Sequence, residues 1–310
     1  VEAIADENLQ AMNIASGVEI LGVTGTLEPI ASVPYELITE IELADAGDTG
    51  DWFVVDGFIA EVGQALVTNQ QNATPTGDAY GAAMSADGQY LAVGYASSPY
   101  LTTYKWSTAN NRYEKTAAQD ANPTGNGYGA AMSADGQYLA VAHDTTPYLT
   151  TYKWSTANNR YEKTAAQNAN PAGNGRGTAM SADGQYLAVG YASSPFLTTY
   201  KWSTANNRYE KTAAQDANPT GNGWGAAMSA DGQYLAVAHY KTPFLTTYKW
   251  STANNRYEKT AAQDANPAGT GRGAAMSADG QYLAVAHYTT PFLTTYKWST
   301  ANNRYEKTAA

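Results

Sequence analysis

The sequence predicts an all-β protein built from five copies of one four-stranded unit. Two motifs carry this prediction, because each returns every 48 residues almost unchanged. "SADG" begins at Ser85, Ser133, Ser181, Ser229 and Ser277, and "KWSTANNRYEKTAA" begins at Lys105, Lys153, Lys201, Lys249 and Lys297. The third observation is the composition, in which 24 Tyr and 28 Gly favour strands and tight turns over helices.

Each copy contains four segments with the pattern of a short strand. In the first copy, "YGAAMS" from Tyr80 leads into an Asp-Gly turn, and "QYLAVGY" from Gln89 follows it. "LTTYKWS" from Leu101 alternates as a half-buried strand does, and "TANNR" turns the chain into "RYEKTAA" from Arg112. Four strands in roughly 40 to 50 residues are typical of a propeller blade. We therefore expect a five-bladed β-propeller, with a linear β-solenoid as the alternative.

The distribution of charge predicts two domains. Residues 1–70 hold thirteen acidic residues and no Lys or Arg, whereas residues 71–310 hold fifteen acidic and eighteen basic residues. We expect an acidic, β-rich attachment or stalk segment over 1–70 and the propeller over 71–310. The blades are expected at about 78–125, 126–173, 174–221, 222–269 and 270–310.

Bulk properties exclude several classes of function. The chain has no cysteine, so it forms no disulfide and no thiolate metal site. It has no apolar run long enough to enter a membrane and no basic stripe of the kind that binds nucleic acid.

Small residues in the first strand predict a crowded axis and a closed ring. We expect the inner glycines of the blades near the axis, at Gly81, Gly129, Gly177, Gly225 and Gly273. We expect the repeated tryptophans to pack between blades, at Trp106, Trp154, Trp202, Trp250 and Trp298. Arg304–Thr308 should complete the last blade, with Ala65–Thr68 as the lead-in from the stalk.

Differences among the copies fall at two places, while the turns "SADGQ" and "STANNR" are invariant. In an antiparallel blade these two places lie at the same end of the strands. One position, at the start of the first strand, holds Tyr80, Tyr128, Arg176, Trp224 and Arg272. The other place, after the second strand, holds Tyr95, His143, Asp144, Tyr191, His239, Tyr240, Lys241, His287 and Tyr288. We interpret these residues as a ligand-binding face, because aromatic and Arg side chains dominate binding energy; neutral drift in exposed loops is the alternative.

The inventory of reactive residues predicts that the chain is not an enzyme and needs no cofactor. His143, His239 and His287 occupy equivalent positions in different blades, which stack about 10 Å apart, too far to share a metal. Asp87 and its copies recur, but they belong to a turn that favours Asp for backbone reasons. No blade contains a nucleophile, a base and an orienting acid in an arrangement that stands out from its copies.

One loop in the acidic segment has the composition of a hard-cation site. "DAGDTGDW" places Asp45, Asp48 and Asp51 at three-residue spacing. A solvated acidic turn is the preferred interpretation, so no metal site is predicted.

The pattern "YGAAMSADGQYLAVAHDTTPYLTTYKWS" resembles the WD40-like repeats of bacteriophage structural proteins. "ENLQAMNIASGVEILGVTGTLE", from Glu7 to Glu28, resembles a module of phage tail and fibre proteins. The chain departs from standard WD40 blades, because Ser follows Trp106 and its copies where Asp is usual, and the Gly-His pair is missing.

The resemblance implies a virion protein that acts outside the cell. Its propeller face would bind a host-surface glycan or a protein receptor, and residues 1–70 would contact other virion proteins. The alternative is a purely structural or decorating component that makes symmetric protein contacts. The resemblance to trimeric phage fibres also implies a homotrimer.

Overall fold

The computed structural model describes residues 19–20, 23–24 and 73–308. The chain forms two compact units, Val1–Asn69 and Gln70–Ala310. In the first unit, β1 (Glu19–Ile20) and β2 (Val23–Thr24) pair antiparallel. Among the described residues, no helix is long and apolar enough to span a membrane.

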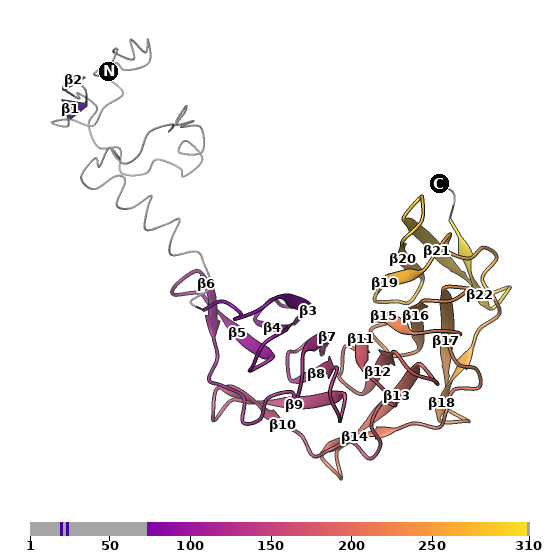
Figure 1. Cartoon of the computed structure of the whole chain (residues 1–310), viewed down its shortest axis with the longest axis horizontal. Helices are drawn as coiled ribbons and strands as arrows, with labels where there is room; N and C mark the ends of the chain where they lie inside the picture. The colour runs from indigo at the N-terminus through magenta and orange to yellow at the C-terminus, as the bar shows by residue number, and fades with distance from the viewer. Residues whose placement is uncertain (1–18, 21–22, 25–72, 309–310) are drawn as a thin grey trace. The chain divides into compact units, whose positions relative to one another are not determined.

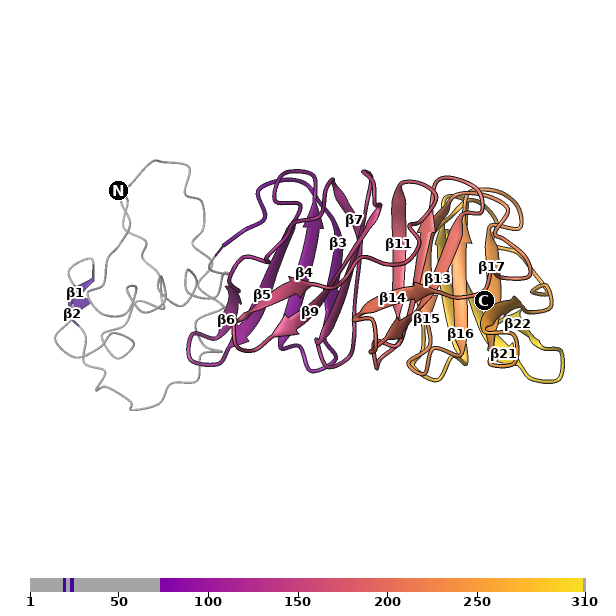
Figure 2. The ribbon, with the colours of Figure 1, turned by 90° about the horizontal axis from the view of Figure 1, so that it is seen from below.

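The prediction of an all-β, five-bladed propeller is confirmed. Residues 73–308 contain no helix, and they form five antiparallel sheets of four strands in chain order (Figures 1 and 2). The blades are as follows: blade 1, β3 (Ala79–Met84), β4 (Tyr90–Tyr95), β5 (Leu101–Ser107), β6 (Arg112–Lys115); blade 2, β7 (Gly127–Met132), β8 (Tyr138–His143), β9 (Leu149–Ser155), β10 (Arg160–Lys163); blade 3, β11 (Gly175–Met180), β12 (Tyr186–Tyr191), β13 (Leu197–Ser203), β14 (Arg208–Lys211); blade 4, β15 (Gly223–Met228), β16 (Tyr234–His239), β17 (Leu245–Ser251), β18 (Arg256–Lys259); blade 5, β19 (Gly271–Met276), β20 (Tyr282–His287), β21 (Leu293–Ser299), β22 (Arg304–Lys307).

The invariant turns owe their shape to local side-chain chemistry. Asp87 accepts a hydrogen bond from the Ser85 hydroxyl at 2.6 Å and from the Gln89 N–H at 2.9 Å, and Gly88 takes a positive φ of 69°. The bond from Ser85, followed by that from Gln89, lowers the pKa of Asp87. These bonds give the Asp that recurs in every copy a structural role in its turn.

Adjacent blades meet through one set of contacts that repeats at every junction. At the first junction, Tyr90 packs edge-on against Trp154 with ring centroids 5.0 Å apart, and the Ala86 N–H donates to the Ala134 carbonyl at 2.8 Å. The tryptophans of blades 2 to 5 are 6 to 7% exposed, which confirms their predicted place between blades. Trp106 is only half-buried, because no described blade precedes blade 1.

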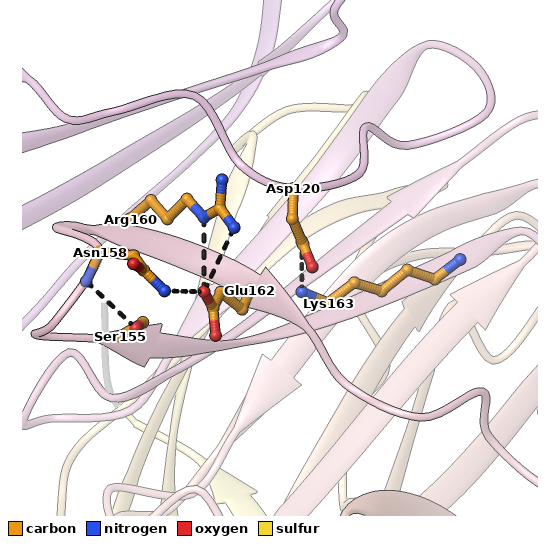
Figure 3. Close-up of polar contacts among 6 residues, drawn as sticks. All are labelled: Asp120, Ser155, Asn158, Arg160, Glu162 and Lys163. Atoms are coloured by element: carbon orange, nitrogen blue, oxygen red, sulfur yellow. Dashed lines mark hydrogen bonds and ion pairs between the residues drawn. The ribbon is translucent and has the colours of Figure 1, made fainter.

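The links between blades also fasten the outer strands. Asp120, in the link between blades 1 and 2, accepts a hydrogen bond from the Lys163 N–H of β10 at 2.7 Å (Figure 3). Glu162, the neighbour of Lys163 in β10, accepts hydrogen bonds from Asn158 in the preceding turn and from Arg160 at the start of the strand. Blades 3, 4 and 5 have the equivalent link bond, so each link holds the blade that follows it.

The ring is open between blade 1 and blade 5, which corrects the expectation of a closed seam (Figure 1). A Cβ on Gly81 or Gly225 would lie within 3 Å of the next blade, whereas a Cβ on Gly273 would meet only Ala286 of its own blade, at 3.9 Å. The predicted completion of the last blade is confirmed, because β22 pairs with β21 from Arg304 to Lys307. Ala65–Thr68 lie outside the described residues. The first and last blades therefore each keep one uncovered face.

Candidate functional site

The most variable residue of each copy lies on a β-bulge in the innermost strand. In blades 2 to 5 it stands between two glycines, and the register between the first and second strands shifts across it. Tyr80 occupies the same bulge in blade 1, between Ala79 and Gly81. A bulge re-aims a side chain away from the alternation of the sheet. The "G-x-G" pattern is the sequence signal for this bulge, which was not predicted.

In the first three blades these residues stack on one another. The rings of Tyr80 and Tyr128 are 4.9 Å apart and stacked, and the Arg176 guanidinium lies 4.0 Å from the centre of the Tyr128 ring. We call Tyr80, Tyr128 and Arg176 the first ladder. The bulge therefore brings side chains from three blades into one stack.

A second ladder extends over blades 4 and 5. The Arg272 guanidinium lies 3.5 Å from the centre of the Trp224 ring and 4.1 Å from that of Tyr288, and Tyr240 packs against Trp224 at 5.4 Å. We call these four residues the second ladder. Its two tyrosines are accessible, with Tyr240 51% and Tyr288 65% exposed. Trp224 is half-buried and already has a partner on either side.

Both ladder arginines keep free hydrogen-bond donors. The Tyr128 ring covers one flat face of Arg176, and the rings of Trp224 and Tyr288 both lie against Arg272. Neither arginine side chain has a hydrogen bond or an ion pair to another described residue. A guanidinium carries five N–H groups around its edge, in a fork that matches a carboxylate or a phosphate. The stacking fixes the plane of the group, so its donors are already oriented when a ligand arrives.

The two variable segments lie at one end of each blade, as predicted. In blade 2, Asp144 after β8 accepts hydrogen bonds from both the backbone and the side-chain amide of Asn126 in the preceding link. In blade 4, the Thr220 hydroxyl donates to the Thr242 carbonyl at 2.7 Å. Asp144 thus supports the loop of blade 2, while Lys241 is exposed in the corresponding loop of blade 4.

Five residues assigned to the binding face are instead core residues, which corrects that part of the prediction. The group is Tyr95, His143, Tyr191, His239 and His287, and none is more than 5% exposed. Each closes the end of the second strand with a hydrogen bond of 2.9 to 3.0 Å to a buried Thr hydroxyl of the third strand. Burial lowers the pKa of His143 and His239 to about 4.

No metal site is found among the described residues, where no three His, Cys, Asp or Glu side chains cluster. Asp45, Asp48 and Asp51 lie outside them.

The outer strands carry shallow depressions near the end of the blades that is opposite to the ladders. One of them lies between Trp106, Glu114 and Asn159. The copies repeat the residues of that depression without change, in contrast to the ladders.

Comparisons with known proteins identify the fold and no family. No protein-family model matches the sequence, and a search of curated proteins finds no match. Among solved structures, a protein of unknown function from Desulfotomaculum acetoxidans superposes with a TM-score of 0.61 at 12% identity, over 76% of this chain and 71% of that one.

Two further structures carry enzyme names. One, from Bacteroides uniformis, is named as a 6-phosphogluconolactonase (TM-score 0.56, 13% identity, 73% of this chain and 69% of that one). The other is the periplasmic gluconolactonase of Pseudomonas aeruginosa (TM-score 0.56, 18% identity, 76% and 72%). The expectation that the chain is not an enzyme is therefore corrected, since similar propellers bear the names of hydrolases. Differences among the five copies carry no information about this likeness to propellers with enzyme names.

Proposed function

We propose that the ladder end of the propeller binds an acidic glycan, within a virion component that recognises the host surface. The observation that carries the proposal is the pair of stacked arginines, Arg176 and Arg272, whose N–H edges have no partner among the described residues. Sugars stack on aromatic faces and accept hydrogen bonds from a fixed guanidinium edge. A carboxylate on the sugar adds charge-assisted bonds, worth about 1.5–3 kcal/mol each.

The charge of the propeller is compatible with an anionic ligand. The formal net charge of the chain is −10, but residues 1–70 carry −13 of it and residues 71–310 carry +3. The ladder end presents Arg176, Arg272 and Lys241. Screening limits the long-range repulsion from the acidic segment to about 8 Å at physiological salt, and short contacts with these cations then dominate.

A glycan array that compares sialylated and uronate-containing glycans with neutral ones tests the proposal. The whole chain should retain acidic glycans, and Arg272→Gln should weaken this binding at least tenfold. Arg304→Gln is the matched control, because Arg304 pairs with Glu306 at the opposite end of the same blade. Equal losses in the two variants would contradict a site on the ladder.

The competing proposal is a structural or decorating role with symmetric protein contacts, and a protein receptor is a further one. Each uses the same exposed aromatic residues, such as Tyr240 and Tyr288. An array without any signal, together with binding to other virion proteins, would favour these roles over glycan recognition.

A second candidate function is the hydrolysis of a sugar lactone, favoured by the names of two similarly folded proteins. The product of such a reaction is a sugar acid, whose carboxylate and hydroxyls suit the ladder arginines. Hydrolysis of glucono-1,5-lactone, followed by proton release, tests this candidate. Turnover that falls in Arg272→Gln and persists in Arg304→Gln would support it.

A further inference from the structure

Every blade has two different faces, and each junction joins one of each kind. We call the side that packs on the next blade the forward face; in blade 1 it includes Tyr90, Ala92 and Leu101. We call the side that packs on the preceding blade the backward face; in blade 2 it includes Leu139 and Trp154. A junction is thus a contact between unlike surfaces.

At the two ends of the arc, one face of each kind is uncovered. Leu293 and Tyr282, on the forward face of blade 5, are each 52% exposed, whereas the counterparts of Leu293 in blades 1 to 4 are at most 1% exposed. On the backward face of blade 1, Met84 is 51% exposed and Leu91 is half-buried, whereas Leu139 of blade 2 is fully buried. Contiguous apolar surface of this kind marks an interaction site.

The same ends leave one junction hydrogen bond unmade. In each of blades 1 to 4, the Ala N–H of the "SADG" turn donates to the equivalent carbonyl of the next blade at 2.8 Å. The Ala278 N–H of blade 5 has no such acceptor among the described residues, and the Ala86 carbonyl of blade 1 has no such donor. The free ends therefore match in polar as well as apolar groups.

Closure of the ring within one chain would require all junctions to change. The Tyr–Trp contact has the same centroid distance, 5.0 Å, and the same interplanar angle, 63°, at each of the four junctions. The arc is uniformly curved, and tightening it would disturb four well-packed interfaces to form a fifth. A blade from another molecule can dock without any such change.

We propose that the forward face of blade 5 binds the backward face of blade 1 in a second copy of this chain. The residues that form these faces are the same in every blade apart from a few positions, such as Gly94 against Ala142 on the forward face and Tyr95 against His143 on the backward face. The four internal junctions therefore serve as templates for this contact. Tyr282 of one copy then packs on Trp106 of the next, and the Ala278 N–H donates to the Ala86 carbonyl. Such an interface is heterologous, and head-to-tail contacts that do not close a ring give open assemblies.

Sedimentation of the full chain over a range of concentrations tests the proposal. The wild-type protein should gain mass with concentration. Leu293→Lys blocks the forward face and Met84→Lys the backward face, and each variant alone should remain monomeric, with association weakened more than tenfold. Two further variants test the same faces at other residues: Tyr282→Lys blocks the forward face, and Ala82→Lys blocks the backward face. Thr300→Lys and Thr108→Lys are the controls, because they add the same charge to exposed turns of the same blades.

Mixing the two blocked variants distinguishes this interface from any other. Each retains the face that the other lacks, so an equimolar mixture should form a dimer that grows no further. A mixture that stays monomeric would overturn the proposal, as would a single blocked variant that still self-associates. A wild-type monomer whose Met84 resists oxidation would also overturn it, since the chain would then cover its own faces.

Discussion

At the scale of single residues, near-identical copies let one blade serve as the control for another. Tyr95 and Tyr191 do in two blades what His143, His239 and His287 do in the other three, namely hydrogen-bond a buried Thr. We had interpreted this variation as part of a binding face. A small Gly precedes each larger Tyr, and a larger Ala precedes each smaller His, so the two side-chain volumes compensate one another. Such compensation indicates a core position.

The buried histidines predict a loss of stability in acid. The pKa of His143 and His239 is about 4 in the fold, against about 6.5 unfolded. Their effect is absent above pH 6.5, and stability falls as the pH drops towards 4, because only the unfolded chain takes up the protons. Each should cost about 2–3 kcal/mol at pH 4.5.

Urea unfolding at pH 7 and pH 4.5 measures this effect against a variant with the residues of blade 1. Ala142→Gly with His143→Tyr should match the wild type at pH 7 and should lose less stability than the wild type at pH 4.5. If both proteins lost the same free energy of unfolding between pH 7 and pH 4.5, carboxylates and not these histidines would cause the loss of stability in acid.

Two buried tyrosines of one blade should respond oppositely to loss of the hydroxyl. Tyr161 donates to the Gly136 carbonyl at 2.6 Å, whereas the buried Tyr152 hydroxyl has no partner among the described residues. Tyr161→Phe should cost about 1–2 kcal/mol in the free energy of unfolding, and Tyr152→Phe should be neutral or stabilising. Thermal and urea denaturation measure both; a larger loss in Tyr152→Phe would be the contrary result.

At the scale of elements, repetition made the strands and hairpins predictable, because period, turn residues and alternation agreed in every copy. The bulge at the start of the inner strand was not predicted, although it aims the ladder residues. A strand pattern places side chains on alternate faces, and a bulge breaks that rule at one position. The resulting stacks of aromatic and Arg side chains depend on inter-blade geometry that no single copy contains.

Inner-strand glycines should differ in their tolerance of a methyl group. A Cβ on Gly129 would lie 2.5 Å from the Arg176 carbonyl oxygen of the next blade, whereas one on Gly273 has open space before it. Gly129→Ala should therefore cost about 1–3 kcal/mol, and Gly273→Ala should be within about 0.5 kcal/mol of the wild type. Urea unfolding of dilute protein measures both variants. Equal losses would indicate that blade 5 is covered in solution.

At the scale of the whole molecule, one scaffold of invariant turns and inter-blade contacts carries a variable set of side chains at one end. Sequence indicated this division but not the open ring. Every copy carries the same two faces, so sequence alone cannot decide whether the first blade meets the fifth. That outcome depends on the rotation between neighbouring blades, which adds up from one junction to the next.

Under the proposed function, the ladder residues bind the ligand and the copied residues support the fold. The direct test replaces Arg176, Trp224 and Arg272 with Tyr, the residue that blades 1 and 2 already carry at this position, and measures acidic-glycan binding together with thermal unfolding. Acidic glycans should no longer bind, while the unfolding temperature should stay within a few degrees of the wild type. Binding retained at the wild-type level, or a molecule that no longer folds, would contradict this account.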